Sequence, residues 1–216
     1  MLKIASLIKS RALFFYSFIA LIIAVTLFLL IEGKADSFFF FNRFHFTWLD
    51  SIMEYYTNAG NGLFAIGIAL ICFFLLGKKP LGLTIFYSFL SSGLMVQIVK
   101  HLKDSERPQL FFGSSASQYF IKGIDFAHNN SFPSGHTATA FAMATVCVLM
   151  MKNKKGQLLF LLLAALVGFS RIYLGQHFLL DVLVGALIGV ICGTGCVYFA
   201  EKYSGSAAFG NFKLKA

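Results

Sequence analysis

The chain has 216 residues, of which 58% are hydrophobic and 12% are charged, and its formal net charge is +9. Soluble domains are about 45–50% apolar and about 25% charged, so this composition excludes an ordinary soluble domain and also a disordered chain. The length allows a single domain, which we assign to residues 1–216.

Six apolar stretches predict six membrane-spanning helices, because about 17–25 apolar residues suffice to cross the hydrocarbon layer. The first follows Lys3, Lys9 and Arg11, as in a signal peptide. However, its length exceeds the roughly 7–15 residues of a signal's apolar core, and no small-x-small cleavage site follows, so we expect a retained anchor. The stretches lie at about residues 12–31, 62–77, 81–99, 135–151, 157–174 and 178–199. The fold class is therefore predicted to be all-α, a six-transmembrane-helix bundle.

Basic residues between these stretches orient the bundle in a cell (inner) membrane. Most of the 18 Lys and Arg residues fall on the side of the N-terminus, including those in the short turns at 78–79 and 152–155, and Glu201 is the one acid there. The positive-inside rule then places both termini in the cytoplasm. The loops 100–134 and 175–177 are predicted to be extracytoplasmic. The positive charge thus acts as an orientation signal, and we expect no nucleic-acid partner.

Aromatic residues gather between the first two stretches, where a membrane interface is expected. Thr47 followed by Asp50 resembles a capping box. The apolar residues after it recur on one helical face, which predicts a short interfacial helix in the first extracytoplasmic loop. These residues are Trp48, Leu49, Ile52, Met53 and Tyr56.

Polar residues from distant parts of the sequence are predicted to meet at the extracytoplasmic face, because consecutive spans alternate in direction. An Arg or Asp at the bilayer centre costs about 2.5–3.5 kcal/mol. Arg171 and Asp181, each about one turn inside an apolar run, should therefore face each other, a watery cavity or a charged ligand. The set comprises Lys100 and Arg107 after the third stretch, Pro133 to His136 before the fourth, Arg171 at the end of the fifth, and His177 and Asp181 at the start of the sixth.

Phosphoryl transfer is the chemistry that fits this set. Lys100, Arg107 and Arg171 can surround a phosphate dianion, and the two guanidinium groups match its oxygens. Ser134 and Gly135 follow Pro133 at the expected first turn of a helix, where backbone N–H groups point at an anion.

A nucleophile is also available. His177 and Asp181 are four residues apart on one helix face, so the carboxylate can hold one ring nitrogen while the other attacks phosphorus. His136 can protonate the departing oxygen. Because one histidine must be neutral and the other protonated, a bell-shaped pH–rate profile is expected. Taken singly, each piece has a structural explanation, such as a snorkelling lysine, a helix start or a paired histidine. Their joint occurrence on one side favours function.

Three motifs together resemble the signature of the type 2 phosphatidic acid phosphatases, or lipid phosphate phosphatases, in a bacterial integral-membrane form. They are Lys100-x6-Arg107-Pro108, Pro133-Ser134-Gly135-His136 and Ser170-Arg171-x5-His177-x3-Asp181. The resemblance implies a metal-independent enzyme without cofactor that forms a phosphohistidine intermediate. By position it makes His177 the nucleophile, Asp181 its partner and His136 the general acid. It assigns phosphate binding to Lys100, Arg107, Ser134, Gly135 and Arg171.

The resemblance also implies a lipid phosphate substrate: undecaprenyl diphosphate, phosphatidylglycerol phosphate, phosphatidic acid or a lipid A phosphate. The 104–132 loop is expected to influence which lipid head group is bound, but its composition does not indicate a particular head group. Two other classes remain open. An anion or phosphate transporter would use the same cations without needing a nucleophile, and a non-catalytic lipid-phosphate-binding protein would release no phosphate. The oligomeric state cannot be predicted from the sequence.

Overall fold

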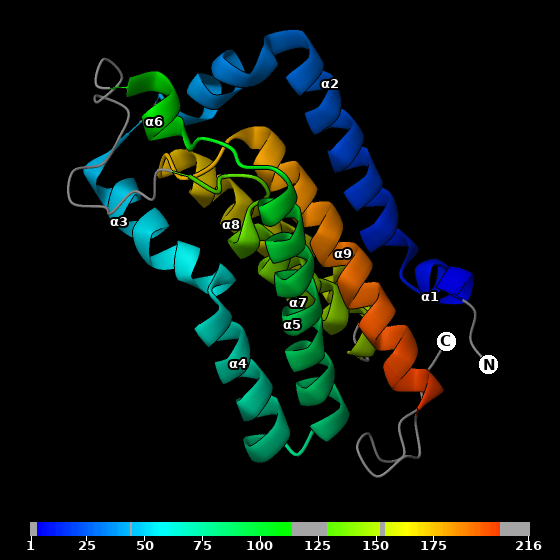
Figure 1. Ribbon diagram of the computed structural model, residues 1–216. Coiled ribbons are helices and arrows are strands. Elements are labelled where there is room, and N and C mark those ends of the chain that lie inside the picture. Colours follow the sequence, from blue (N-terminus) through cyan, green and yellow to red (C-terminus); the bar gives the residue numbers. More distant parts are fainter. Residues whose placement is uncertain (1–3, 44, 114–128, 152–153, 204–216) are drawn as a thin grey trace.

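The computed structural model describes residues 4–43, 45–113, 129–151 and 154–203. Every regular element within these ranges is a helix, which confirms the all-α prediction. In chain order the elements are α1 (Ile4–Ser10), α2 (Ala12–Asn42), α3 (Thr47–Tyr56), η1 (Thr57–Gly60), α4 (Gly62–Leu70), η2 (Ile71–Leu75), α5 (Lys79–Leu102), α6 (Pro108–Phe112), α7 (Gly135–Met150), η4 (Lys154–Gly156), α8 (Gln157–Tyr173) and α9 (Leu179–Lys202) (Figure 1). Most of the 104–132 loop lies outside the described residues.

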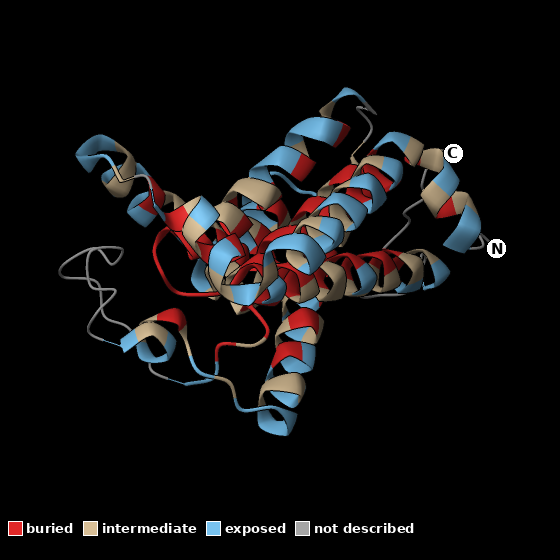
Figure 2. Cartoon of the chain, turned by 90° about the horizontal axis from the view of Figure 1, so that it is seen from above, coloured by how far each residue is buried: buried red, intermediate tan, exposed pale blue. Residues whose placement is uncertain are grey.

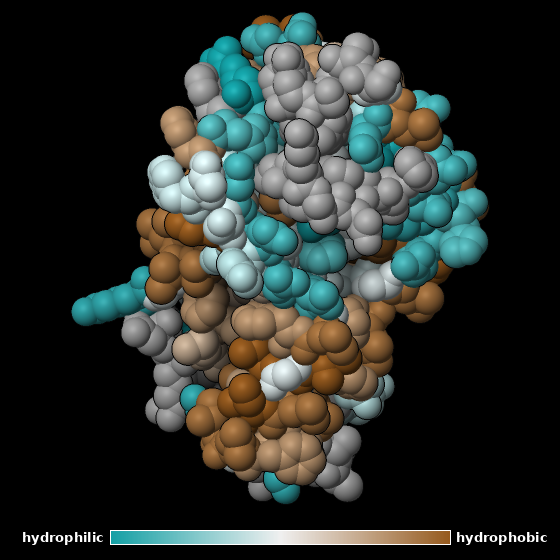
Figure 3. Space-filling model, turned by 90° about the vertical axis from the view of Figure 1, so that its left-hand side faces the viewer, coloured by the Kyte–Doolittle hydropathy of each residue, from teal (hydrophilic) through white to brown (hydrophobic). Residues whose placement is uncertain are grey.

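Each of the six predicted stretches coincides with a helix, but the helices differ in length. By length and composition, α2, α5 and α9 could cross a membrane, and a fourth span results if the segments Thr47–Gly60 and Gly62–Leu75, bent by 60° relative to each other, are counted together. Helices α7 and α8 are apolar but shorter, with 16 and 17 residues. On the face shown in Figure 3, hydrophobic side chains cover much of the lower half and hydrophilic ones gather above, as expected of a membrane protein.

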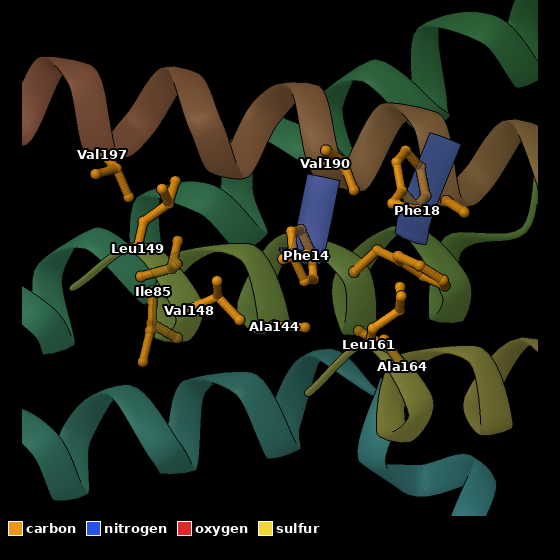
Figure 4. Close-up of a cluster of buried hydrophobic side chains, with 14 of the residues drawn as sticks. Phe14, Phe18, Ile85, Ala144, Val148, Leu149, Leu161, Ala164, Val190 and Val197 are labelled. Atoms are coloured by element: carbon orange, nitrogen blue, oxygen red, sulfur yellow. The ribbon is translucent and has the colours of Figure 1, made fainter. Parts of the chain in front are cut away.

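Helix α7 lies at the centre of the bundle, between α5, α8 and α9, and most of its residues are buried. Viewed along the bundle in Figure 2, buried residues concentrate where the helices meet. The largest buried apolar cluster joins α2, α5, α7, α8 and α9. Side chains labelled in this cluster include Phe14, Phe18, Ile85, Ala144, Val148, Leu161 and Val190 (Figure 4).

Small residues allow α9 to approach α7 closely. Gly185 and Gly193 face α7, where an added Cβ would lie 2.5 Å from the Ser134 carbonyl oxygen and 2.8 Å from the Ala142 carbonyl oxygen. Small residues at such positions let helix backbones come into contact. The contact at Gly185 also fixes α9 against the start of α7, where predicted site residues lie.

Replacing Gly185 with alanine is therefore expected to push α9 away from α7 and to lower the free energy of unfolding by about 1–3 kcal/mol. Gly195 of the same helix is the matched control, since an added Cβ there meets no atom within 4 Å. Gly195→Ala should be neutral, or stabilising by up to about 1 kcal/mol through helix propensity. Chemical unfolding of both variants in detergent tests the difference, and equal effects would contradict this account of the helix contact.

The predicted capping box at Thr47 and Asp50 is wrong. Helix α3 begins at Thr47, its N-cap is Phe46, and no side chain caps it. Asp50 instead accepts hydrogen bonds from the Tyr173 hydroxyl, at 2.5 Å, and faces Nδ1 of His45 at 2.9 Å. The carboxylate is therefore engaged with the end of α8 rather than with the start of its own helix.

Candidate active site

Helix ends from four parts of the chain meet at one end of the bundle, opposite the end where α5 begins and α9 finishes (Figure 1). Lys100 lies in the last turn of α5 and Arg171 in the last turn of α8. Lys100 interacts electrostatically with Arg107, Arg171 and Asp181. The charges of Lys100, Arg107, Arg171 and His177 all act on His136, in the first turn of α7. The structure therefore brings the predicted charged residues and both histidines together.

His177 and Asp181 form a buried pair, with 2% and 4% of their surfaces exposed. Nδ1 of His177 lies 3.5 Å from Oδ2 of Asp181, which is longer than a normal hydrogen bond. The same oxygen accepts hydrogen bonds from the Ser131 hydroxyl at 2.5 Å and from the Phe178 N–H at 2.9 Å. Asp181 is thus held in place from two directions and presents its carboxylate to one nitrogen of the imidazole.

Burial lowers the pKa of His177 to about 4, and the nearby carboxylate of Asp181 opposes this shift. The positive charges of Arg171 and Arg107 act in the same direction as burial. The imidazole is therefore neutral at neutral pH, which is the form that can act as a nucleophile. Because Nδ1 faces Asp181, Nε2 points to the opposite side of the ring.

Arg171 is a buried cation, 7% exposed. Its Nη1 donates to the Thr57 hydroxyl at 2.7 Å, while Nε is buried without a partner in the described part of the chain. Thr57 belongs to η1, so the turn after α3 fixes the position of the guanidinium. An unpaired buried donor is costly unless a ligand satisfies it.

Arg107 is held by Gln176, which directly precedes His177, and by the backbone of Asn129. It donates to Oε1 of Gln176 at 2.8 Å, to the Gln176 carbonyl at 3.4 Å and to the Asn129 carbonyl at 3.2 Å. Burial lowers the pKa of Arg107 from its usual value, and nearby Asp181 opposes the shift. Guanidinium groups keep their charge under such shifts.

The three cations have no carboxylate partners within the described ranges, where the ion pairs are His45–Asp50 and His177–Asp181. Lys100 is half-buried and makes no hydrogen bond through its ammonium group there. Partly desolvated positive charges without a counter-ion are unfavourable on their own. The arrangement therefore suits an anionic ligand.

The start of α7 differs in part from the sequence prediction. Ser134 is the N-cap, and its hydroxyl oxygen accepts from the Thr137 hydroxyl at 2.9 Å and from the Thr137 N–H at 3.4 Å. Its own N–H donates to the Asp181 carbonyl at 3.0 Å, so the expectation that this N–H is free for an anion is wrong. Gly135 is not crowded, since an added Cβ would make only an ordinary van der Waals contact with Val96, at 3.7 Å. A ligand can approach the backbone at Gly135.

Several residues that contact the site were missed from the sequence. Three of them bond to predicted site residues and one bonds to the backbone just after Arg171, all from far along the chain, and no spacing rule connects the partners. These are Thr57 with Arg171, Ser131 with Asp181, Gln176 with Arg107, and Asn42, whose side chain donates to the carbonyls of Ile172 and Tyr173. His45 pairs with Asp50 beside Tyr173. The one sequence signal that could have identified these residues is that they are polar and lie near apolar stretches.

The chain is similar to several named proteins. A Bacillus licheniformis protein named bacitracin transport permease protein BcrC is 42% identical over 83 residues, which are 38% of this chain and 40% of that protein. The undecaprenyl-diphosphatase BcrC of Bacillus subtilis is 28% identical over 69% of this chain and 74% of that protein. The crystal structure of Aquifex aeolicus LpxE matches with a TM-score of 0.60 and 31% identity, covering 76% of this chain and 94% of that one.

The family assignment depends on the region that contains the candidate site. The family model of the PAP2 superfamily matches residues 81–204. This range begins in α5, ends beyond α9 and includes all eight predicted site residues, from Lys100 to Asp181. The chain belongs to the PAP2 superfamily.

Proposed function

We propose that this chain is an integral-membrane phosphatase that hydrolyses the phosphomonoester or diphosphate of a lipid. The observation that carries the proposal is the set of three neighbouring cations without ion-pair partners in the described chain, two of which, Arg107 and Arg171, act on a neutral His177 that faces Asp181. Cations alone would suit an anion carrier. The oriented, neutral imidazole adds a nucleophile, which only a covalent mechanism requires.

The two-step mechanism uses the chain's own residues. Nε2 of His177 attacks phosphorus, the Nε2–P bond forms, and the bond from phosphorus to the lipid oxygen breaks. Asp181 holds the Nδ1 proton and stabilises the positive charge that develops on the ring. His136 gives its proton to the departing oxygen, and then helps water to hydrolyse the phosphohistidine. Lys100, Arg107 and Arg171 bind the phosphate oxygens, together with the backbone at Gly135 and the hydroxyl of Ser134.

The proposed setting is a cell membrane crossed by six helices, with both termini in the cytoplasm, α3 in the outer interface and the site at the extracytoplasmic face. The basic turn at 78–79 and the last turn of α9 lie at one end of the bundle and the candidate site at the other (Figure 1), which supports this orientation. A lipid could then reach the cations from the outer leaflet while its chains stay beside the apolar helix faces.

Candidate substrates are undecaprenyl diphosphate, phosphatidylglycerol phosphate, phosphatidic acid and lipid A phosphates. The deciding experiment measures phosphate release from each by the purified protein in detergent, with and without a chelator. Release that persists with chelator supports the metal-independent mechanism, and release that vanishes overturns it. Because one relative is named a transport permease, vesicles loaded with labelled phosphate form a second arm. Flux without hydrolysis would replace the enzyme by a transporter.

The low pKa of His177 predicts where activity is lost in acid. The nucleophile is neutral above about pH 4, so the acid limb of kcat/KM assigned to His177 should lie well below the value near 6.5 of a free imidazole. The profile should be measured from pH 3.5 to 9, and the substrate's own phosphate titration, followed by ³¹P NMR, should be divided out. An acid limb of the enzyme that remains near pH 6.5 would contradict the burial argument.

A further inference from the structure

A lysine outside the signature reaches the candidate site from α2. The helix is kinked at Gly33, whose φ of 75° and ψ of −175° leave the helical region. Beyond the kink, the second part of α2 crosses the upper end of the bundle toward α6 (Figure 1). Lys34 is the first residue after the kink, and its side chain is exposed. It also precedes residue 81, where the match to the PAP2 superfamily begins.

The ammonium group of Lys34 is held between two aromatic rings. Nζ lies 4.0 Å from the ring centroid of Phe178 and 4.1 Å from that of Phe111. These distances are typical of cation–π contacts. Phe178 is buried, directly follows His177 and is the N-cap of α9. The rings therefore place a positive charge beside the segment that carries the proposed nucleophile.

This charge has no ion-pair partner in the described part of the chain. The charged groups near enough to act on Lys34 are Asp181, Glu106 and Lys103. Asp181 is already engaged with Ser131 and the backbone of Phe178. The ring faces orient the ammonium without neutralising it, so its N–H groups remain available to an acceptor.

The phosphate that His177 attacks already has three cations, Lys100, Arg107 and Arg171. We propose that Lys34 binds a second anionic group beside it, namely the lipid-side phosphate of a diphosphate, and thereby makes lipid diphosphates better substrates than monophosphates. This inference rests on the proposed function and narrows its substrate class. A phosphate that leaves with the lipid carries negative charge, which a lysine can stabilise.

The test compares farnesyl diphosphate with farnesyl monophosphate, which share one lipid chain and differ by one phosphate. The kcat/KM values of the full-length protein in detergent are measured for both. For Lys34→Gln, the value for the diphosphate should fall about tenfold more than that for the monophosphate, the size of a lost charge-assisted hydrogen bond. Lys34→Arg should keep most of the preference. The matched control is Lys79→Gln, which removes another lysine whose ammonium lies over an aromatic ring, that of Phe73. Lys79 lies at the start of α5, at the end of this helix away from Lys100, so its replacement should change neither kcat/KM value.

Gly33→Ala provides a second variant in which the charge is kept but displaced. Nothing lies within 4 Å of an added Cβ, but the backbone conformation at Gly33 is one that alanine rarely adopts. This variant should lose diphosphate preference in the same direction as Lys34→Gln. Equal losses on both substrates, or an unchanged ratio in Lys34→Gln, would overturn the inference.

Binding separates this inference from the proposed function. Calorimetry with methylenediphosphonate and methylphosphonate requires no turnover. Lys34→Gln should weaken binding of the diphosphonate about tenfold more than that of the monophosphonate. If the wild-type protein hydrolyses neither farnesyl compound nor any of the four candidate lipids, the proposed function fails, and the two phosphonate titrations decide whether Lys34 forms a second anion site. Equal weakening of both phosphonates would reject that site.

Discussion

Replacing His177 with asparagine is expected to lower kcat by a factor of at least about 10⁴, because no other described side chain can replace a nucleophile positioned by Asp181. Asparagine is smaller and polar, so it fits the buried position without introducing a charge. Phosphate release from the preferred lipid measures the loss. Rapid quenching of the wild-type enzyme in base, after reaction with ³²P-labelled substrate, should trap a labelled histidine that the variant lacks.

His101→Asn is the matched control for this prediction. His101 is exposed on α5, next to Lys100, and its Nδ1 lies 2.7 Å from the Gln97 carbonyl. Its replacement removes an imidazole from the same face of the molecule and should leave kcat unchanged. Both variants should elute from size exclusion as the wild-type protein does. Retention of more than a tenth of the activity by His177→Asn would remove His177 from the role of nucleophile.

The meeting of the signature residues could be predicted because they lie at helix ends. A chain that crosses a layer in alternate directions brings every second loop to the same side. Lys100, Arg171 and His177 need no side-chain detail for this argument, only a count of apolar stretches. The structure brings these residues together, and the PAP2 superfamily match confirms the family prediction. The individual roles of the residues stay predictions.

The contacts that orient these groups could not be predicted in the same way. Thr57 lies 114 positions from Arg171, and Ser131 lies 50 positions from Asp181. Such pairs arise from the way the helices pack, and no local periodicity encodes them. The same packing explains the wrong capping box, because the Asp50 carboxylate accepts a hydrogen bond from Tyr173 of α8 and does not cap α3. Local patterns failed here because a tertiary partner competed for the same carboxylate.

The extent of α2 shows a related limit of hydropathy. Charged residues at Glu32, Lys34 and Asp36 end the apolar run, so the predicted span stopped near residue 31. The helix nevertheless continues to Asn42 across the kink at Gly33. Hydropathy indicates which part of a helix can contact lipid. It does not show that the helix continues past the lipid-facing part, as α2 does where it crosses the polar end of the bundle. The inferred site of Lys34 lies in this extension, where sequence patterns alone gave no reason to expect one.

Arg171 allows activity and stability to be separated. Arg171→Met should reduce kcat/KM by about 10²–10³, the usual cost of removing a positioned charge from a phosphate or oxyanion site. Its thermal unfolding midpoint should stay the same or rise, because the wild-type guanidinium is buried without a carboxylate partner in the described chain. Replacing a buried charge by an apolar group of similar volume is often neutral or stabilising.

Thr57→Val tests the same site through a positioning residue. It removes the hydroxyl bonded to Nη1 of Arg171, so kcat/KM should fall by about tenfold, and Thr57→Ser should restore it. Vanadate, which resembles a phosphoryl group, supplies a readout without turnover. Vanadate binding should raise the unfolding midpoint of the wild-type protein. It should raise the midpoint of Thr57→Val by less, and it should not change the midpoint of Arg171→Met. A midpoint that drops steeply in Arg171→Met would instead mean that the guanidinium mainly stabilises the contact between α8 and η1. Lys100 and Arg107 would then be the cations left to bind the anion.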